Sequence, residues 1–403
     1  MKIPNDWNMA KFGELAKITC GVAATPEYVD AAIGVPFLSA RNVQKERLDL
    51  SYFQHIPREL HEKLTKNTKP AKGDVLLTRV GAGIGEAAVV DIDFEFSVYV
   101  SLTLIKCGKY LDSEYVKSLL NTNYYRYLAT RDQFAGGGVQ NLNVQMVKEY
   151  PIPVPPLPEQ KKIAKILSTW DKAITTTEQL LVNSQQQKKA LMQQLLTGPH
   201  PSKPRLLDQN GERFSGEWRE NHLRDVSEIV MGSSPKSSAY NETGDGMPLI
   251  QGNADIKHRL SAPRIHTSEI TKECSQGDIL LSVRAPVGKV AISQHEACIG
   301  RGISSIKAKS NESQDFLYQW LLWFEPRWGS LSQGSTFESI NSDDIKSLKM
   351  KIPYLEEQQK IAAVLSTADQ EISTLQQKLD ALKQEKKALM QQLLTGKRRV
   401  KLN

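Results

Sequence analysis

The sequence predicts an α+β protein made of two pseudo-symmetric halves, each a mixed, mostly β domain with helices followed by one long helix. Three observations support this fold class. The stretch KKALMQQLLTG occurs at 188–198 and again at 386–396. An apolar period of 3.5 residues runs through both segments that end in this stretch. Short β-branched and aromatic runs, separated by Gly and Asp, fill the regions before them.

The repeat extends well beyond these eleven residues. With a shift of 198 residues, 154–198 align with 352–396 without a gap, and 27 of the 45 positions are identical. The preceding regions align more loosely, for example KGDVLLTRVGAGIGEAAVV (72–90) with QGDILLSVRAPVGKVAIS (276–293). A variable domain therefore alternates with a nearly constant long segment, which is the pattern of a duplicated unit.

The first domain is expected to be mostly β. GDVLLTRV and the run that begins at Ala87 have the composition of strands, and GDILLSVRA takes the same place in the second domain. Helical spacing follows in SEYVKSLLNTNYYRYLATRD and in ESQDFLYQWLLWFEPRWGSL. The expected order is a first domain at 1–155, a long helix at 156–198, a linker at 199–213, a second domain at 214–353, a second long helix at 354–396 and a basic tail at 397–403. The tail is expected to be a solvated end.

The two long segments are predicted to be helices that pack against each other. A helix of roughly 38 residues is about 57 Å long, whereas globular helices average about 11–12 residues. Pro158 suits a first helical turn, and Gly198 and Gly396 stand where a left-handed residue ends a helix. Apolar residues spaced alternately by three and four predict a coiled-coil seam, which contains Ile163, Leu167, Trp170, Ile174, Leu181, Leu191, Leu195, Ile361, Leu365, Ile372, Leu379, Leu389 and Leu393.

Composition limits the class of protein. Apolar residues make up 40% and charged residues 24%, and the net charge of +7 favours a polyanionic partner only weakly. No apolar run approaches the roughly 20 residues that span a bilayer. The first residues lack the apolar core of a signal peptide, so a cytoplasmic location is expected. The four cysteines lie far apart and are interpreted as reduced thiols.

Motifs of catalysis are not recognisable. RVGAGIGEA (79–87) lacks G-K-[ST] and lies between two predicted strands, so it is interpreted as a tight hairpin that carries a basic residue. VPPL (154–157) lacks the flanking residues of an amino-methyltransferase motif and is interpreted as an extended lead into a helix. Neither H-E-x-x-H nor G-x-S-x-G occurs. The sequence therefore favours a binding protein without metal or cofactor.

PIPVPPLPEQKKIAKIL and its second copy KIPYLEEQQKIAAVL, together with GDVLLTR, GDILLSVR and the closing LLTG, resemble the specificity subunit of type I restriction–modification enzymes. The resemblance covers essentially the whole chain. It implies two target-recognition domains, each reading one half of a split, asymmetric double-stranded DNA target. It also implies an antiparallel coiled coil that separates the readers and docks methyltransferase subunits, which connect to restriction subunits. S-adenosylmethionine and ATP are then expected on those partners.

Candidate DNA contacts follow from the residue types that read base edges or hold phosphates. Gly136–Gly138 either let the backbone approach a phosphate or form only a flexible turn. The candidates in the first domain are Arg41, Asn42, Arg79, Gln140, Asn141 and Asn143, and those in the second are Gln251, Asn253, Arg284, Lys289, Ser335 and Thr336.

Two alternatives to a DNA-recognition and assembly subunit remain at this point. One is a fused methyltransferase–nuclease with disguised motifs, which methyl transfer or cleavage by the isolated chain would reveal. The other is a coiled-coil scaffold without DNA affinity, for which DNA binding would be absent or insensitive to salt. The duplicated Gln193, Gln194 and Thr197 are not explained by a leucine seam alone, which favours two copies of one docked partner.

Overall fold

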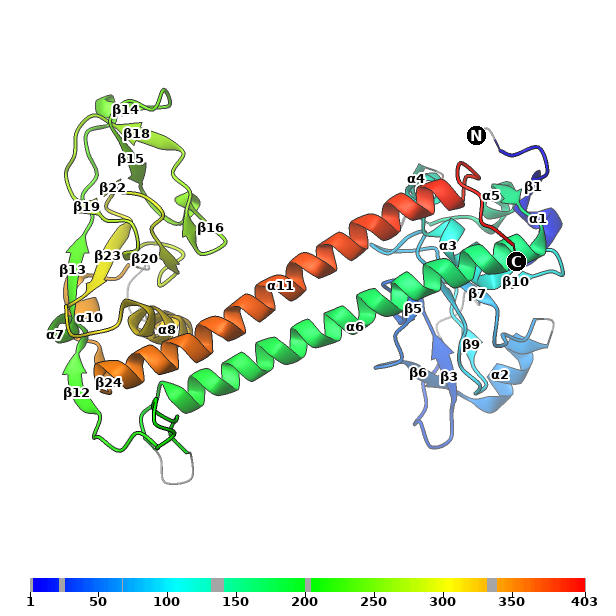
Figure 1. Ribbon diagram of the computed structural model, residues 1–403. Helices are drawn as coiled ribbons and strands as arrows, with labels where there is room; N and C mark the ends of the chain where they lie inside the picture. The colour runs from blue at the N-terminus through cyan, green and yellow to red at the C-terminus, as the bar shows by residue number, and fades with distance from the viewer. Residues whose placement is uncertain are drawn as a thin grey trace. The chain divides into compact units, whose positions relative to one another are not determined.

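The structure is a computed structural model that describes residues 3–21, 26–66, 68–131, 141–199, 204–331 and 339–402. It divides into two compact units (Figure 1). Unit 1 comprises Met1–Glu178 and Gln377–Asn403, and unit 2 comprises Gln179–Gln376. Each unit therefore combines one predicted domain with a part of each long helix.

Unit 1 consists of short strands and short helices before its long helix, as the sequence predicts. Its helices are α1 (Phe12–Leu15), α2 (Arg58–Thr65), α3 (Ser113–Leu120), α4 (Asn123–Arg131) and α5 (Val144–Lys148), with a 3-10 turn at Ala40–Asn42. Its strands are β1 (Asn8–Lys11), β2 (Ala16–Cys20), β3 (Val35–Leu38), β4 (Val43–Gln44), β5 (Arg47–Leu48), β6 (Gln54–Ile56), β7 (Val75–Thr78), β8 (Ala87–Val89), β9 (Ser97–Val98), β10 (Leu102–Cys107) and β11 (Pro151–Val154).

The largest sheet of unit 1 has the order β2-β10-β7-β8, and β6-β3-β9 form a second sheet. The β7 sequence VLLT is buried at all four positions, so its uninterrupted apolar run reflects burial on both faces. One face packs on a core that contains Tyr115 of α3 and Ile163 of the first long helix, while the other meets Phe96 and its neighbours. Two pairs, β1-β11 and β4-β5, complete the unit.

Unit 2 repeats this plan. Its helices are α7 (Leu223–Val226), α8 (Gln314–Phe324), α9 (Trp328–Leu331) and α10 (Ser342–Lys346), with 3-10 turns at Ser237–Ala239, Asn253–Asp255 and Glu325–Arg327. Its strands are β12 (Arg219–His222), β13 (Ser227–Met231), β14 (Tyr240–Asn241), β15 (Met247–Ile250), β16 (Ile256–Lys257), β17 (Leu260–Ser261), β18 (Ile265–Thr267), β19 (Glu273–Cys274), β20 (Ile279–Ser282), β21 (Val290–Ile292), β22 (Ala297–Ile299), β23 (Ile303–Ala308) and β24 (Lys349–Ile352).

The sheets of unit 2 have the orders β13-β23-β20-β21-β17-β16 and β14-β18-β15-β22-β19, beside the pair β12-β24. The first four strands of the larger sheet correspond to β2-β10-β7-β8 of unit 1. The hairpins β4-β5 and β16-β17 also match, since both turn through two non-glycine residues with positive φ, Lys45 and Glu46 in unit 1 and His258 and Arg259 in unit 2. Shared backbone detail of this kind confirms the duplicated α+β architecture.

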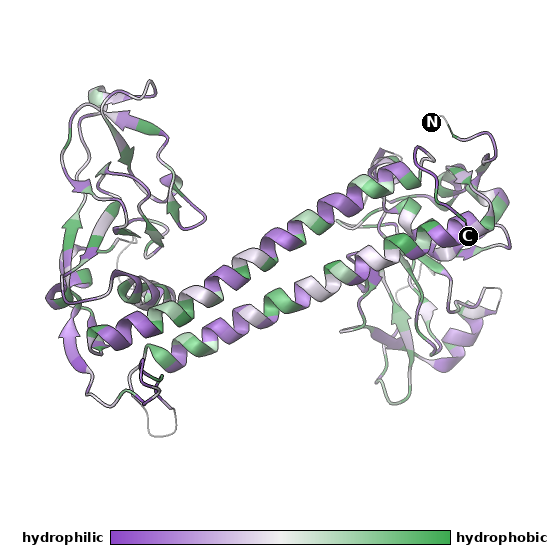
Figure 2. Ribbon diagram, viewed as in Figure 1, coloured by the Kyte–Doolittle hydropathy of each residue, from purple (hydrophilic) through white to green (hydrophobic). Residues whose placement is uncertain are grey.

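The long segments form α6 (Leu157–Leu195) and α11 (Leu355–Leu393), each of 39 residues. Pro158 lies in the first turn of α6, and Gly198 and Gly396 have φ values of 92° and 71° after the helix ends, as predicted. Hydrophilic and hydrophobic residues alternate along both helices (Figure 2). The predicted seam residues are buried or half-buried throughout. None of the described helices is both long enough and apolar enough to cross a bilayer.

Within each unit, α6 and α11 run antiparallel. In unit 1 the Asp171 carboxylate contacts Lys386 Nζ at 2.7 Å, and in unit 2 the Asp369 carboxylate contacts Lys188 Nζ at 2.5 Å. These two pairs exchange under the 198-residue shift. Burial alone would lower the pKa of Lys386, but the charges of Glu46 and Asp171 outweigh it and raise that pKa. The seam therefore includes one charged position in each unit, a feature that can favour a particular register.

The PEQ signature has a structural explanation. Gln160 is fully buried: its Oε1 accepts a hydrogen bond from Asp112 N at 2.9 Å, and its Nε2 donates to Tyr110 O and Pro155 O. Gln358 repeats this arrangement, accepting from Ser313 N and donating to Pro353 O. The glutamine therefore joins the start of each long helix to the short helix of its own domain.

The C-terminal tail differs from the expectation of a solvated end. Arg399 Nε and one terminal nitrogen donate to both carboxylate oxygens of Glu159, at 2.7 and 2.8 Å. Its two terminal nitrogens also donate to Asp6 at 2.8 and 2.7 Å. Because Glu159 is buried, the guanidinium compensates a charge that would otherwise be costly. The difference concerns Arg399 alone: Lys397, Arg398 and Arg399 are all exposed, as expected, but Arg399 is also ion-paired and joins the tail to the start of α6.

Candidate nucleic-acid interface

The hairpin between β20 and β21 presents Arg284. Val283 N donates to Gly302 O, and Ile340 N donates to Val283 O, so neighbouring segments hold the backbone directly before Arg284. Ser282 Oγ closes the turn by donating to Pro286 O at 2.7 Å. Ser282 and Val283 are buried, and the side chain of Arg284, at the next position, is exposed. The predicted contact Arg284 is therefore exposed on this hairpin.

A second segment, Gln251–Asn253, follows β15. Gln251 N donates to Asp255 Oδ2 at 2.9 Å, and Arg264 Nε donates to Asp255 Oδ1 at 2.8 Å. The Asp255 side chain is buried and its charge is satisfied by these two donors. The buried Asp255 side chain therefore holds the turn in place. The amide side chains of Gln251 and Asn253 are half-buried at the surface.

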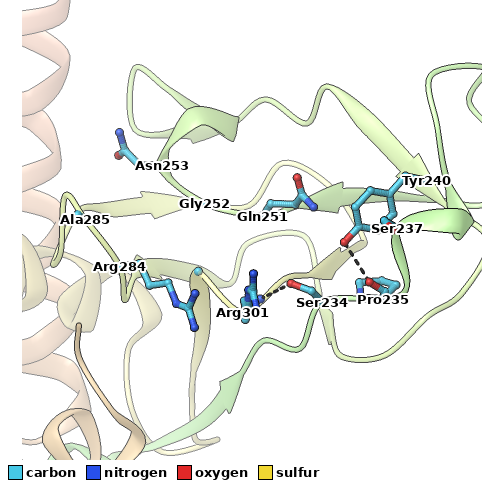
Figure 3. A pocket seen from close by; sticks show the side chains of 11 residues that line it. Ser234, Pro235, Ser237, Tyr240, Gln251, Gly252, Asn253, Arg284, Ala285 and Arg301 are labelled. Atoms are coloured by element: carbon cyan, nitrogen blue, oxygen red, sulfur yellow. Dashed lines mark hydrogen bonds between the residues drawn. The ribbon is translucent and has the colours of Figure 1, made fainter. Parts of the chain in front are cut away.

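These two segments line one cavity of about 620 Å³ (Figure 3). Gln251, Asn253 and Arg284 are three of the predicted contacts. The structure adds residues that the sequence reading missed, above all Arg301, whose backbone N donates to Ser234 Oγ at 3.2 Å. The complete lining is Ser234, Pro235, Ser237, Tyr240, Gln251, Gly252, Asn253, Arg284, Ala285, Arg301 and Gly302.

A local signal for Arg301 exists in the sequence. The basic residue stands between two glycines in IGRGIS, and the nearby SSPKSSAY is rich in small polar residues. Only glycine fits at position 302, because an added Cβ would lie 2.3 Å from Gln251 O. This close approach joins the Arg301 segment to the Gln251 segment, which no spacing rule along the chain could reveal.

Lys289 was predicted as a contact but belongs to an ion cluster beside the hairpin. Its Nζ donates to Glu325 Oε1 at 3.1 Å, and Arg259 donates to both oxygens of the same carboxylate at 2.6 and 3.2 Å. Burial alone would raise the pKa of Glu325, but these basic groups outweigh it and hold the pKa below its ordinary value. The charge of Lys289 is therefore partly engaged within unit 2.

Arg79 does not project from its hairpin, which corrects the interpretation of RVGAGIGEA. Its Nε donates to Leu142 O at 2.7 Å and a terminal nitrogen donates to Val100 O at 3.2 Å, while the side chain is buried. Arg79 N donates to Ser101 O just as Val283 N donates to Gly302 O. Arg79 therefore corresponds to Val283, and Val80 corresponds to Arg284. A difference of one position reverses the face on which the side chain lies.

Asn42 is likewise an internal residue. Its Nδ2 donates to Asp49 O and Tyr52 O at 2.9 and 2.8 Å, and its Oδ1 accepts from Ser39 N at 3.0 Å. The side chain is buried and its hydrogen-bonding capacity is used by the backbone, so it closes the turn after β3. Arg41 in the same turn is exposed.

The remaining predicted residues are distributed as follows. Asn143 Oδ1 accepts from Gln145 N at 2.8 Å and caps α5, which is a structural use of the side chain. Asn141 pairs with Val80 through an isolated bridge, and its Oδ1 is buried without a hydrogen-bond partner among the described residues. Gln140, Ser335, Thr336 and Gly136–Gly138 lie outside the described residues.

The cavity has the chemistry of a binding site. Its side chains offer guanidinium, amide, hydroxyl and phenol groups, which match the donors and acceptors that nucleic acids present. The described part of the chain contains no group of three or more His, Cys, Asp or Glu side chains arranged to hold a metal ion.

Comparison with known proteins identifies the family. The family model described as "Type I restriction modification DNA specificity domain" matches residues 4–183 and 215–384. A putative type I restriction enzyme MjaX specificity subunit of Methanocaldococcus jannaschii is 31% identical over 412 residues, covering 99% of this chain and 95% of the relative. A chain from a solved structure titled as the basis of complex assembly and conformational transition of the type I R-M system is 25% identical, with a TM-score of 0.60 and coverage of 98% and 99%.

A type I restriction–modification S subunit from M. genitalium shares the fold, with a TM-score of 0.62, 16% identity and coverage of 100% of this chain and 99% of that one. The match to the family model occurs twice, once in each half of the duplicated sequence. The similarity to the M. jannaschii relative extends across both halves and both long helices. The chain therefore belongs to the family of type I restriction–modification DNA specificity subunits.

Proposed function

We propose that this chain is the non-catalytic subunit that selects the DNA target of a type I restriction–modification complex. Each recognition domain binds one half of a bipartite, asymmetric target in double-stranded DNA. The observation that carries the proposal is the contrast between the two halves. The domains present different residues at equivalent surface positions, Val80 against Arg284, whereas the long helices are nearly identical. Variation is expected where sequence is read, and constancy where a common partner docks.

The same contrast supports docking of two copies of one methyltransferase subunit, which in turn recruit restriction subunits. Three positions of the repeated stretch are exposed in both copies: Lys189 and Lys387, Ala190 and Ala388, and Gln193 and Gln391. Gln193 Oε1 accepts a hydrogen bond from Trp323 Nε1 at 3.2 Å, but no side-chain hydrogen bond or ion pair among the described residues accounts for the identity of the lysine and alanine pairs. S-adenosylmethionine and ATP are expected on the partner subunits, and the assembly is expected to act in the cytoplasm, where chromosomal DNA is accessible.

Co-expression with the methyltransferase encoded nearest to this chain tests the docking surface. Ala190→Glu should remove one methyltransferase copy from the complex, and Ala190→Glu with Ala388→Glu should remove both, as measured by native mass spectrometry. Gln187→Glu is the matched control, because position 187 is exposed and its counterpart is already Glu385. If the doubly substituted chain retained two methyltransferase copies, the docking proposal would be wrong.

Mapping the bases methylated by the purified complex tests recognition. A bipartite, non-palindromic target is expected, together with binding that weakens as salt concentration rises, because phosphate contacts release counterions. Methylation without a defined target, or the absence of salt-sensitive DNA binding, would instead favour a scaffold. Methyl transfer by the isolated chain would contradict the assignment of catalysis to partner subunits.

Helix length offers a second test. If the helix pair sets the gap between the half-sites, a heptad added after both Glu178 and Gln376 lengthens it by about 10 Å, or about three base pairs. The preferred gap should change by that amount, while the bases recognised in each half stay the same. An unchanged gap would show that the helices do not set it.

A further inference from the structure

The hydrogen-bond pattern of the backbone defines which residues of the two domains are equivalent. Tyr99 N donates to Leu38 O in unit 1, and Gly300 N donates to Ile250 O in unit 2. Gly21 N and Gly232 N donate to Leu102 O and Ile303 O in the same way. Together with the match of Arg79 to Val283, these pairs place Val100 opposite Arg301, Val80 opposite Arg284, and Ser39 opposite Gln251.

The two arginines at the cavity of unit 2 differ from the other basic side chains around them. Arg259, Arg264 and Lys289 are engaged by carboxylates, at 2.6, 2.8 and 3.1 Å. Within the described ranges, the guanidinium groups of Arg284 and Arg301 have no hydrogen bond or ion pair, and both residues are exposed. Figure 3 shows both side chains at the cavity, next to the Gln251 segment.

The cavity leaves this positive charge uncompensated. No Asp or Glu is among the described residues that line it. Two guanidinium forks held by separate segments, the β20-β21 hairpin and the turn before β23, face a space of about 620 Å³. A ligand with paired acceptors would complete their hydrogen bonds, because the guanidinium group donates through two parallel N–H groups.

Base recognition explains the difference between the domains better than phosphate binding. Phosphate contacts are independent of sequence, so a phosphate site at this position would be useful in both domains. Unit 1 instead has Val80 and Val100, which offer no hydrogen-bond donor from their side chains. The guanine edge in the major groove presents O6 and N7 as a pair of acceptors, the arrangement that arginine binds in bidentate form.

From these observations we propose that the half-site read by the second domain contains guanine, recognised in the major groove by Arg284 and Arg301. The first domain makes no arginine contact from the equivalent positions, and its half-site does not depend on guanine there. This inference rests on the proposed function, because it assigns base specificity to the DNA-reading surface of unit 2. It makes Arg284 and Arg301 determinants of the target sequence.

The complex of this chain with its methyltransferase provides the test. After the target is mapped, Arg284→Val and Arg301→Val introduce the residues that unit 1 has at these positions. Each substitution should weaken binding to the mapped target about 10- to 100-fold, because the contact with one guanine is lost. Base selection should be relaxed only at the position of that guanine, in one half-site. Arg224→Ala is the matched control, since this exposed arginine of unit 2 lies outside the cavity lining.

Modified DNA separates base reading from a structural effect of the substitutions. Replacing the affected guanine by 7-deazaguanine removes the N7 acceptor and should weaken DNA binding by the unsubstituted complex. It should not weaken binding further in the variant, Arg284→Val or Arg301→Val, that has lost the arginine contacting that guanine. Inosine retains O6 and N7 and should bind as guanine does. Non-additive losses of this kind report a direct contact between the changed groups.

Three results would overturn the inference while leaving the proposed function intact. The half-site affected by these substitutions could lack guanine, 7-deazaguanine could bind as well as guanine, or the substitutions could weaken all DNA equally with a smaller salt dependence. The last outcome would identify phosphate contacts. Absence of any defined target for the unsubstituted complex would contradict the proposed function itself.

Discussion

Arg205 and Arg399 provide a matched comparison of buried charges in the two units. Arg205 binds both carboxylate oxygens of Glu357, as Arg399 does with Glu159. Glu159 and Glu357 are equivalent under the 198-residue shift, and their side chains are only 1% and 4% exposed. Arg205→Ala is expected to destabilise unit 2 more than Arg399→Ala destabilises unit 1.

The magnitudes follow from what remains around each carboxylate. Trp7 Nε1 donates to Glu159 at 3.1 Å, so Arg399→Ala leaves one strong donor and should lower the free energy of unfolding by about 1–3 kcal/mol. The described residues give the Glu357 carboxylate no donor other than Arg205, and Trp218 Nε1 has no partner. Removing Arg205 therefore leaves an uncompensated buried charge, at a cost of about 3–5 kcal/mol.

Urea titration with hydrogen exchange measured on peptides from each unit would resolve the two effects. A difference of about 2 kcal/mol corresponds to about 1 M in the unfolding midpoint when the slope is about 2 kcal/mol/M. Glu357→Gln in the Arg205→Ala chain should recover part of the loss, because the unpaired charge is removed. Equal losses for the two arginine substitutions, or no recovery, would refute the reasoning.

Three further predictions concern Arg79, Gln160 and Glu325. Arg79→Met should lower the stability of unit 1 by about 1–3 kcal/mol, because two backbone carbonyls lose their donor. The methylated target should stay unchanged. Thermal unfolding and methylation mapping check the two parts, and an altered target would contradict the structural role. Gln160→Ala and Gln358→Ala should each destabilise their own unit by about 1–3 kcal/mol. Gln187 is exposed, so Gln187→Ala should have little effect. Hydrogen exchange at the start of α6 and α11 measures the difference. The folded-state pKa of Glu325 lies below its ordinary value of 4.5, so its contribution to stability is present above that pH and is lost as pH falls through the lower folded-state pKa. Unfolding measured from pH 7 to pH 3 should show this loss in unit 2 and a weaker dependence for Glu325→Gln; identical profiles would contradict the assignment.

Several features of the fold were predictable because they depend on local pattern. The long helices, Pro158 in a first turn and the left-handed Gly198 and Gly396 follow from helical period and from the conformational freedom of glycine. The apolar runs around β7 and β20 predicted strands from their β-branched and apolar composition, and the structure adds that both strands are fully buried. The duplication could be recognised in the sequence because the two helix segments have barely diverged.

The candidate site was only partly predictable. Gln251, Asn253 and Arg284 were predicted and line one cavity. Arg301 was not predicted, because it lies at the cavity through a close backbone approach between Gly302 and Gln251, which are far apart in the sequence. Asn42 and Arg79 have the residue types of base readers, yet the fold uses their donors for backbone carbonyls. Residue type shows which hydrogen bonds a side chain is able to make, and not which groups will be near it.

By itself, the sequence determined the duplicated α+β plan, the long helices and the family, because each depends on periodicity or on similarity along the chain. Only the tertiary structure decided which polar groups are consumed inside each unit and which remain free. Arg79 and Arg284 lie in corresponding hairpins of the two domains, but the strand pairing places Arg79 opposite Val283, so the two arginines differ by one position. The strand is buried through Val283 and the chain is exposed from Arg284 onward, so that single step buries one arginine and exposes the other.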